Sequence, residues 1–445
     1  MSHSVHFSGI RVRLGVCRGL TVACLTGVLG MVASAHAATE CVDSHGSSGC
    51  YKTISAAVSA ASSGDTVKVN PGTYAEEVQV GKSISLIGED RDTTIIDAKG
   101  LSNGIYIDGF DNPGLAEVVV TGFTVQHANF EGILVQNTSS VTVWGNTVSD
   151  NDASLQISSS TCPGQPAFET NEGDDCGEGI HLMGVDHSTI EGNLVERNSG
   201  GILISDETAV NHDNAITHNI VRDNAYDCGI TLASHGAYVK SGTAPLAFGI
   251  YHNTVSENES IHNGFGAGGG AGVGLFAPGP GNVNVENSIV HNKLIDNDMP
   301  GVTIHNHVFL TFPGHPPNPD VNDNVIVGNY ISGNQADPDL PTTVPTGISV
   351  LGTTPITGLV ISDNDIENES IDVAVNSASR VDLHLNDFEG KGVGVANLNT
   401  GGTVNATENW WGCEGGPGAH GCSTIVGGAT VTYTPWLTKG IDEER

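Results

Sequence analysis

The 445-residue sequence has few basic side chains, few aromatic rings and no long apolar run late in the chain. Its 16 Lys and Arg residues stand against 50 Asp and Glu residues, which gives a formal net charge of −34. A surface of this sign repels phosphate chains, so nucleic acid is excluded as a partner. The same field repels any other acidic polymer unless a divalent cation such as calcium bridges the two.

The N-terminal segment has the order of a secretory signal peptide. Three arginines within residues 11–18 precede an apolar stretch over residues 20–32, and small residues follow up to Ala37. This order predicts cleavage after Ala37, so that residues 1–37 are removed and the product is secreted or periplasmic. The apolar stretch is shorter than the roughly 20 residues of a membrane span, and no membrane span is expected elsewhere.

Cysteine usage agrees with export, because six of the nine cysteines fall into three close pairs. Each pair would close a short loop in an oxidising compartment. The pairs are Cys41 with Cys50, Cys162 with Cys176, and Cys413 with Cys422. Cys228 is left over, and a buried unreactive thiol is favoured over a nucleophile because no cationic residue adjoins it in sequence.

Two short sequence motifs, here called phrases, recur along the chain, and their repetition is a stronger structural signal than any local secondary-structure propensity. One contains two asparagines five residues apart and returns six times, from VTVWGNTVSDN at 141–151 to NVIVGNYISGN at 324–334, with fainter copies around Asn364, Asn386 and Asn409. The other is a glycine followed by alternating apolar residues, from GIHLMG at Gly179 to GISVLG at Gly347. Alternation of this kind predicts short strands separated by polar turns.

These units predict a stacked solenoid, because none of them can bury its own apolar face. Stacking at about 4.8 Å pairs each strand with its neighbours above and below. The repeated asparagine is expected to adopt the left-handed conformation and to bond the adjacent turns as an internal ladder. The column from Asn146 to Asn329 is therefore interpreted as structural rather than catalytic.

The ends are expected to close the solenoid. Residues 38–64 are predicted to form an N-terminal cap with a short helix over 51–61, whose apolar side is Ile54, Val58 and Ala61, and residues 65–408 the β-helix. Residues 409–445 are predicted to form a tryptophan-rich C-terminal cap, for which a hydrophobic plug is favoured over a sugar-binding platform. Its tryptophans are Trp410, Trp411 and Trp436.

A family resemblance supports this interpretation. The segment TISAAVSAASSGDTVKVNPGTY at 53–74, with SISLIG after it, resembles the opening of pectin-lyase-like right-handed β-helix proteins. The Asn and Gly phrases look like the repeats of the carbohydrate-binding and sugar-hydrolase subgroup that includes NosD-like periplasmic proteins. The resemblance implies an all-β fold, a single-stranded right-handed parallel β-helix with a short N-terminal capping helix, and a polysaccharide as the ligand. The scaffold hosts many activities, so it does not fix the reaction.

Alignment of the Gly phrases places a polar column on one outer face. Strand alternation puts His181, Asp206, His235 and His305 on neighbouring rungs of that face. Carboxylates and imidazoles on a rigid frame suit acid and base work on a glycosidic bond or a uronate. The alternative is that these side chains are merely solvated.

A long insertion borders this face and contains the sequence GDDC at 173–176. Asp174 and Asp175 resemble the paired aspartates of polygalacturonases, and both are candidate catalytic residues. With Glu178, which is also a candidate for substrate binding, they are candidate calcium ligands. His235 would have to replace the His-Gly element of that family and Lys240 its basic element, but both lie far from the expected positions.

Two further groups are candidates. Lyase chemistry needs a base and neutralisation of a uronate, for which Arg222 with Asp223 and Asp227 is the candidate group. The Asp-Pro-His-Asp motif of β-helix epimerases is absent. His305 and His307 could bind copper or zinc, although a surface coincidence is favoured, and His307 is otherwise a candidate for substrate binding.

The sequence thus predicts a monomeric polysaccharide-active protein that uses an outer groove, with lyase- or hydrolase-type cleavage. Calcium is the one expected ion, and no organic cofactor is expected. The alternative is a non-catalytic surface or periplasmic binding protein, adhesin-like or NosD-like.

Overall fold

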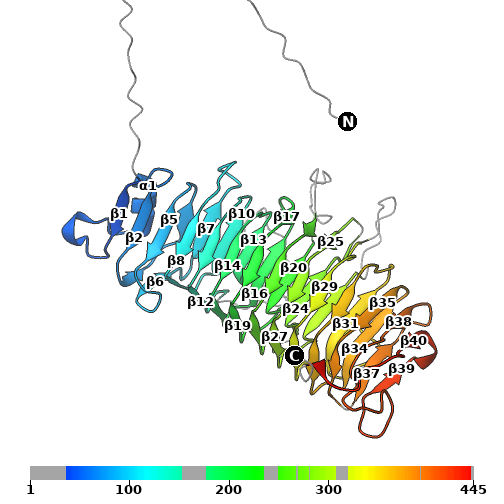
Figure 1. The fold of residues 1–445 in the computed structure, drawn as a ribbon. Helices are drawn as coiled ribbons and strands as arrows, with labels where there is room; N and C mark the ends of the chain where they lie inside the picture. Colours follow the sequence, from blue (N-terminus) through cyan, green and yellow to red (C-terminus); the bar gives the residue numbers. More distant parts are fainter. Residues whose placement is uncertain are drawn as a thin grey trace, which may run out of the picture. The chain divides into compact units, whose positions relative to one another are not determined.

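A computed structural model of the chain describes residues 37–152, 177–234, 249–266, 269–279, 281–306, 319–390 and 392–441 (Figure 1). The predicted signal peptide up to residue 36 and the pair Cys162 and Cys176 lie outside the described residues. Nearly all described elements are short strands, which lie side by side from β1 to β40 (Figure 1).

The strands form three long parallel sheets and one small one, here named A, B, C and D. Sheet A contains β1 (Thr39–Val42), β2 (Thr66–Val69), β5 (Ser85–Gly88), β8 (Val119–Thr121), β11 (Thr142–Trp144), β14 (Thr189–Glu191), β18 (Ala215–Thr217), β22 (Thr254–Ser256), β26 (Ser288–Val290), β29 (Val325–Val327), β32 (Val360–Ser362), β35 (Arg380–His384), β38 (Thr403–Asn405) and β40 (Val431–Thr432). Sheet B contains β3 (Gly72–Tyr74), β6 (Thr94–Asp97), β9 (Thr124–Gln126), β12 (Thr147–Ser149), β15 (Leu194–Glu196), β19 (Ile220–Arg222), β23 (Glu259–Ile261), β27 (Lys293–Ile295), β30 (Tyr330–Ser332), β33 (Asp365–Glu367) and β36 (Asp387–Phe388). Sheet C contains β4 (Val78–Val80), β7 (Ile105–Asp108), β10 (Ile133–Gln136), β13 (Glu178–Met183), β16 (Gly200–Ser205), β20 (Ile230–Ala233), β24 (Val273–Phe276), β28 (Val302–His305), β31 (Thr346–Gly352), β34 (Ile371–Ser377), β37 (Val393–Asn397) and β39 (Thr424–Val426). Sheet D contains β17 (Asn211–His212), β21 (Ile250–Tyr251) and β25 (Asn284–Val285).

Each rung visits the sheets in a fixed order. Strand β10 of sheet C leads to β11 of sheet A and β12 of sheet B, and the chain then returns to sheet C as β13, which pairs in parallel with β10. The predicted β-helix solenoid is confirmed. Its coils extend beyond the predicted 65–408, because β1 already pairs with β2, and β39 and β40 continue sheets C and A.

The core is a set of stacked apolar columns inside the solenoid. The column predicted from the Gly phrases has the expected register, and each of its members is fully buried. Full burial of such a side chain contributes about 1.5–3 kcal/mol, so every rung adds to the same continuous core. The column consists of Ile180, Ile202, Ile230, Val273, Val302 and Ile348.

Asparagine ladders line three corners of the solenoid, where the sequence predicted one column. In each ladder the side-chain oxygen of one asparagine accepts bonds from the backbone N–H and the side-chain amide of the asparagine one rung before it, as between Asn219 and Asn258 at 2.9 and 3.0 Å. The left-handed residue is the one before the asparagine, for example His218 with φ 56°, and not the asparagine itself. The reason is that the asparagine side chain must point inward to reach the next rung.

Apolar side chains are buried at both ends of the described solenoid. Helix α1 (Ile54–Ala60) buries Ile54, Val58 and the adjoining Ala61, and its first N–H groups bond the carboxylate of Glu76. At the other end Trp411 is fully buried with its ring 5.1 Å from that of Phe388.

Covalent bonds hold two loops near these ends. The disulfides Cys41 to Cys50 and Cys413 to Cys422 are formed, and Cys228 is a buried free thiol, as expected. Short 3-10 turns cover Ser47–Gly49 and Gly428–Thr430. None of the helices in the part of the chain described here has the length and apolar character needed to cross a bilayer.

Candidate functional site

The outer face of sheet C carries a cluster of two carboxylates and one imidazole, here named the carboxylate cluster. Its members are Glu131, Glu178 and His181. One ligating atom from each lies within 4.8 Å of the others, and all three side chains are at most 4% exposed. Titratable groups held this close away from water are the usual ingredients of acid and base catalysis.

Glu131 is the best-anchored member of the cluster. Its Oε1 lies 3.0 Å from Nδ1 of His181, and its Oε2 accepts the backbone N–H of Glu178 at 2.8 Å. Oε2 of Glu178 is 3.8 Å from the same imidazole nitrogen. These two contacts fix the orientation of the Glu131 carboxyl group.

A short polar chain continues from the imidazole to the next rung. Nε2 of His181 lies 2.8 Å from Oγ of Ser205, whose hydroxyl donates to Glu207 at 3.3 Å. Ser205 therefore links the imidazole of His181 to the carboxylate of Glu207.

The cluster forms because the same short phrase occurs on two successive rungs. Glu131-Gly132-Ile133 and Glu178-Gly179-Ile180 enter β10 and β13 in the same way, and Ile133 pairs with Ile180. A Cβ at Gly132 would approach the carbonyl oxygen of Gly179 to 2.5 Å, so the glycine is needed for the rungs to stack. Glu131 is not among the residues predicted from the sequence, although the Gly phrases extend one rung back to Gly132, directly beside it.

A second buried imidazole lies farther along the same sheet. Nε2 of His305 is 2.7 Å from Oδ2 of Asp337, which also accepts from Ser349 at 2.6 Å and from Thr303 at 3.1 Å. Burial acts to raise the pKa of Asp337, but the hydrogen bond and the charge of His305 outweigh it and lower this pKa to about 2. Both hydroxyls bond Oδ2 of Asp337, and only that of Thr303 also contacts Nε2 of His305, at 2.8 Å, so this is a closed buried network and not a nucleophile with its base.

The residues predicted for the outer face that the structure describes do lie on one sheet, but they are buried and do not line an exposed groove. His181, Asp206 and His305 belong to strands or strand ends of sheet C, as expected, yet all three are buried. His181 and His305 are four strand steps apart, which is about 19 Å at the spacing of stacked strands. The expectation of one exposed constellation is therefore wrong, because column alignment fixes register but not what covers the column.

Three other predicted residues make structural contacts. Oδ2 of Asp206 accepts from Ser234 and from the N–H of Gly249, both at 2.8 Å, and so ties two rungs together. Asp227 accepts the hydroxyl of Thr231 at 3.0 Å. Arg222 belongs to sheet B and pairs with Glu196 at 2.7 Å, so it does not share a face with His181.

The remaining predicted residues lie outside the described part of the chain. They are Asp174, Asp175, His235, Lys240 and His307. Of the expected calcium ligands, only Glu178 is described. Its neighbours are one carboxylate and an imidazole, whereas calcium prefers oxygen atoms alone.

Comparisons with known proteins agree with the fold. The family model for the right-handed β-helix region matches residues 92–270. The Dettilon tailspike protein (gp208) is similar in structure, with a TM-score of 0.53 and 14% identity over 84% of this chain and 63% of the tailspike. DFA-IIIase from Arthrobacter chlorophenolicus A6 in complex with GF2 also has a TM-score of 0.53, with 12% identity over 84% of this chain and 89% of the enzyme.

A third structure is more distant, and the curated proteins add nothing. The catalytic unit of the α-1,3-glucanase from Streptomyces thermodiastaticus strain HF3-3 has a TM-score of 0.45 and 12% identity over 86% of this chain and 65% of its own. No curated protein sequence matches the chain. At these identities the likeness concerns the fold, and the chain spans less than two thirds of the tailspike's length. The parallel register of the rungs and the matched model together show that the chain folds as a right-handed parallel β-helix.

Proposed function

We propose that this protein is an extracellular or periplasmic polysaccharide-active protein that cleaves glycosidic bonds at the carboxylate cluster. The observation that carries the proposal is the pair of buried carboxylates, Glu131 and Glu178, on successive rungs beside His181. Paired carboxylates are what most glycoside hydrolases use. Two disulfides support an oxidising compartment.

The geometry favours a retaining mechanism. Retaining enzymes hold their two carboxyl groups about 5–5.5 Å apart, whereas inverting enzymes leave a wider gap for water. One oxygen of Glu131 lies within 4.8 Å of one oxygen of Glu178. Glu131, oriented by two donors, is assigned as the nucleophile that forms the glycosyl ester. Glu178 is assigned as the acid that protonates the leaving oxygen and then as the base that activates water.

Charge favours a neutral glycan over a polyuronate. The twelve strands of sheet C, as the structure describes them, contain no Lys or Arg. Elimination from a uronate needs a cationic group to neutralise the carboxylate, and Arg222, the candidate for that role, lies on another sheet. Hydrolysis is therefore favoured over lyase chemistry.

The test is a panel of neutral and acidic polysaccharides, with and without calcium, assayed for new reducing ends and for unsaturated uronates. Wild type should release reducing ends from a neutral glycan, and NMR of the first product should show a retained anomer. Glu131→Gln and Glu178→Gln should each lower the rate by about 10²–10⁴-fold. His305→Asn, a buried histidine of the same sheet, is the matched control and should retain activity. Unsaturated products, or equal activity in all four proteins, would refute the assignment.

Burial favours a second candidate, a non-catalytic glycan-binding protein. Every residue of β13 is buried, so a polymer must displace whatever covers this strand before it reaches Glu178. In a binding protein the carboxylate cluster would instead be a hydrogen-bonded part of the frame. Retention of a glycan on an affinity gel without turnover, unchanged in the Glu131→Gln variant, would decide for this alternative.

A further inference from the structure

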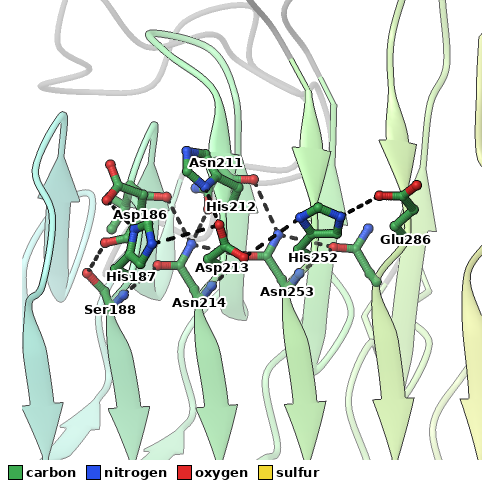
Figure 2. Close-up of polar contacts among 12 residues, drawn as sticks. Asp186, His187, Ser188, Asn211, His212, Asp213, Asn214, His252, Asn253 and Glu286 are labelled. Atoms are coloured by element: carbon green, nitrogen blue, oxygen red, sulfur yellow. Dashed lines mark hydrogen bonds and ion pairs between the residues drawn. The ribbon is translucent and has the colours of Figure 1, made fainter. Parts of the chain in front are cut away.

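Three histidines gather around one aspartate at the corner where the chain passes from sheet D to sheet A (Figure 2). This histidine corner consists of His187, His212, Asp213 and His252. It lies outside the carboxylate cluster and shares no residue with it. None of the four residues has a role in the proposed function.

Asp213 stands at the centre of the corner. Its Oδ2 is 2.8 Å from Nδ1 of His212 and 3.9 Å from Nε2 of His187, and its Oδ1 is 3.7 Å from Nδ1 of His252. Three imidazole nitrogens therefore point at a single carboxylate from three sides. The ligating atoms of His187, His212 and Asp213 all lie within 4.8 Å of one another.

Outer carboxylates orient two of these rings. Nδ1 of His187 lies 2.7 Å from Oδ1 of Asp186, which leaves Nε2 facing Asp213. Nε2 of His252 bonds Glu286, which leaves Nδ1 facing Asp213 (Figure 2). A histidine that binds a metal usually donates its other ring N–H to a carboxylate in this way, which fixes the tautomer and raises the basicity of the ligating nitrogen.

The backbone beneath the corner is rigid. His187, Asp213 and His252 are left-handed residues with φ of 50°, 56° and 56° on successive rungs. Each precedes a member of the corner's internal ladder, formed by Ser188, Asn214 and Asn253, which are at most 2% exposed. The ring of His212 also stacks on that of Tyr251 at 4.9 Å and 3°, one rung away.

We propose that the histidine corner binds one divalent transition-metal ion of the zinc class, through the three imidazoles and the Asp213 carboxylate. Imidazole nitrogens with one carboxylate suit zinc, copper or nickel, and are poor ligands for calcium or magnesium. In the complex the metal would lie between Asp213 and the rings, after Nδ1 of His212 has lost its proton.

Other exposed corners of the solenoid provide the comparison. His218 pairs with Glu257, and His262 with Asp223, at equivalent left-handed positions. Within the described residues neither pair has a third ligand close enough to complete a group. Histidine beside an acid thus recurs at these corners, and among the exposed corners that the structure describes, only the histidine corner brings three ligating side chains together.

The test is calorimetric titration of untagged full-length protein with zinc chloride at pH 7.5, with calcium chloride as the comparison ion. One zinc should bind per chain with micromolar or tighter affinity, and calcium should give no heat at this site. The double variant His187→Gln and His252→Gln should abolish this binding, whereas His218→Gln, the matched control, should leave it unchanged.

A further variant separates a metal site from a merely stabilising ion-pair network. Asp186→Asn keeps the size of the side chain but weakens the orientation of His187, and it should weaken zinc binding by about tenfold or more while circular dichroism stays unchanged. Acidification to pH 5.5 should release the zinc, because the ligands must lose their protons to bind it. Zinc binding that survives the double variant, or equal binding of calcium, would overturn the proposal.

Discussion

Glu369 occupies a position that asparagine fills elsewhere in its ladder, and the presence of a carboxyl group there makes the stability of the fold depend on pH. Its Oε1 accepts the backbone N–H and the side-chain amide of Asn334 at 2.9 and 3.1 Å, as the ladder requires. Its Oε2 is buried without a hydrogen-bond partner. Glu369→Gln keeps the accepting oxygen and removes the titratable one, so the variant isolates the effect of charge.

The magnitude follows from the pKa of Glu369. Burial raises it from an ordinary 4.5 to about 7, against the opposing bonds from Asn334 and with a smaller contribution from the charge of Asp296. The folded state thus keeps a proton that the unfolded state loses, and stability falls as pH rises from 4.5 to 7. A difference of about 2.5 pKa units corresponds to about 3 kcal/mol.

Urea denaturation at pH 4.5 and pH 8.5 provides the assay. The free energies of unfolding of Glu369→Gln and wild type should agree at pH 4.5, and the variant should be more stable by about 3 kcal/mol at pH 8.5. Burial, and to a smaller extent the charge of Glu369, also raises the pKa of Asp372; the effect of burial has the same sign and is present in both proteins, whereas the contribution of Glu369 is lost in the variant. Glu191→Gln, at an exposed position of sheet A, is the control and should match wild type throughout. A variant with no advantage at pH 8.5, or with one only at pH 4.5, would refute the reasoning.

Three further changes test the frame of the solenoid. Asn258→Ala should lower the free energy of unfolding by about 3 kcal/mol or more, because it leaves the buried N–H of Asn219 and other ladder groups without a hydrogen-bond partner. Urea unfolding measures this loss, and a value below about 1 kcal/mol would contradict the role of the ladder. Trp411→Ala should cost about 3–5 kcal/mol in the same assay by opening the C-terminal plug, and an unchanged midpoint would show that the plug does not seal the core. Replacing Cys41 and Cys50 by Ser should cost about 2–3 kcal/mol for a nine-residue separation, and equal unfolding of oxidised and reduced wild type would count against it.

Register was predictable because the solenoid is a one-dimensional repeat. Each Gly phrase pairs with the phrases before and after it, so aligning the sequences of the repeats also aligns their strands. Ile180, Ile202 and Ile230 pair as expected. The capping helix was predictable for a similar reason, because the apolar spacing from Ile54 to Val58 is local. Long-range packing does not enter either argument.

The composition of the sites was less predictable. Glu131 precedes the first full Asn phrase, at 141–151, so it escaped notice, and the expected partnership of His181 with His305 failed on distance. His187, Asp213 and His252 occupy turn positions that read as solvated polar residues. Their convergence appears only when the left-handed corners are stacked.

The sequence by itself determined an acidic chain with stacked parallel strands, because periodicity of two within a strand and recurrence along the chain are local properties of the residues. It also determined which positions share a column. Only the tertiary structure decided which polar columns are buried, since burial depends on what neighbouring turns cover. It likewise decided which side chains from successive rungs meet, because a contact such as that of His212 with Asp213 and Tyr251 depends on rotamers and on the hand of the turn.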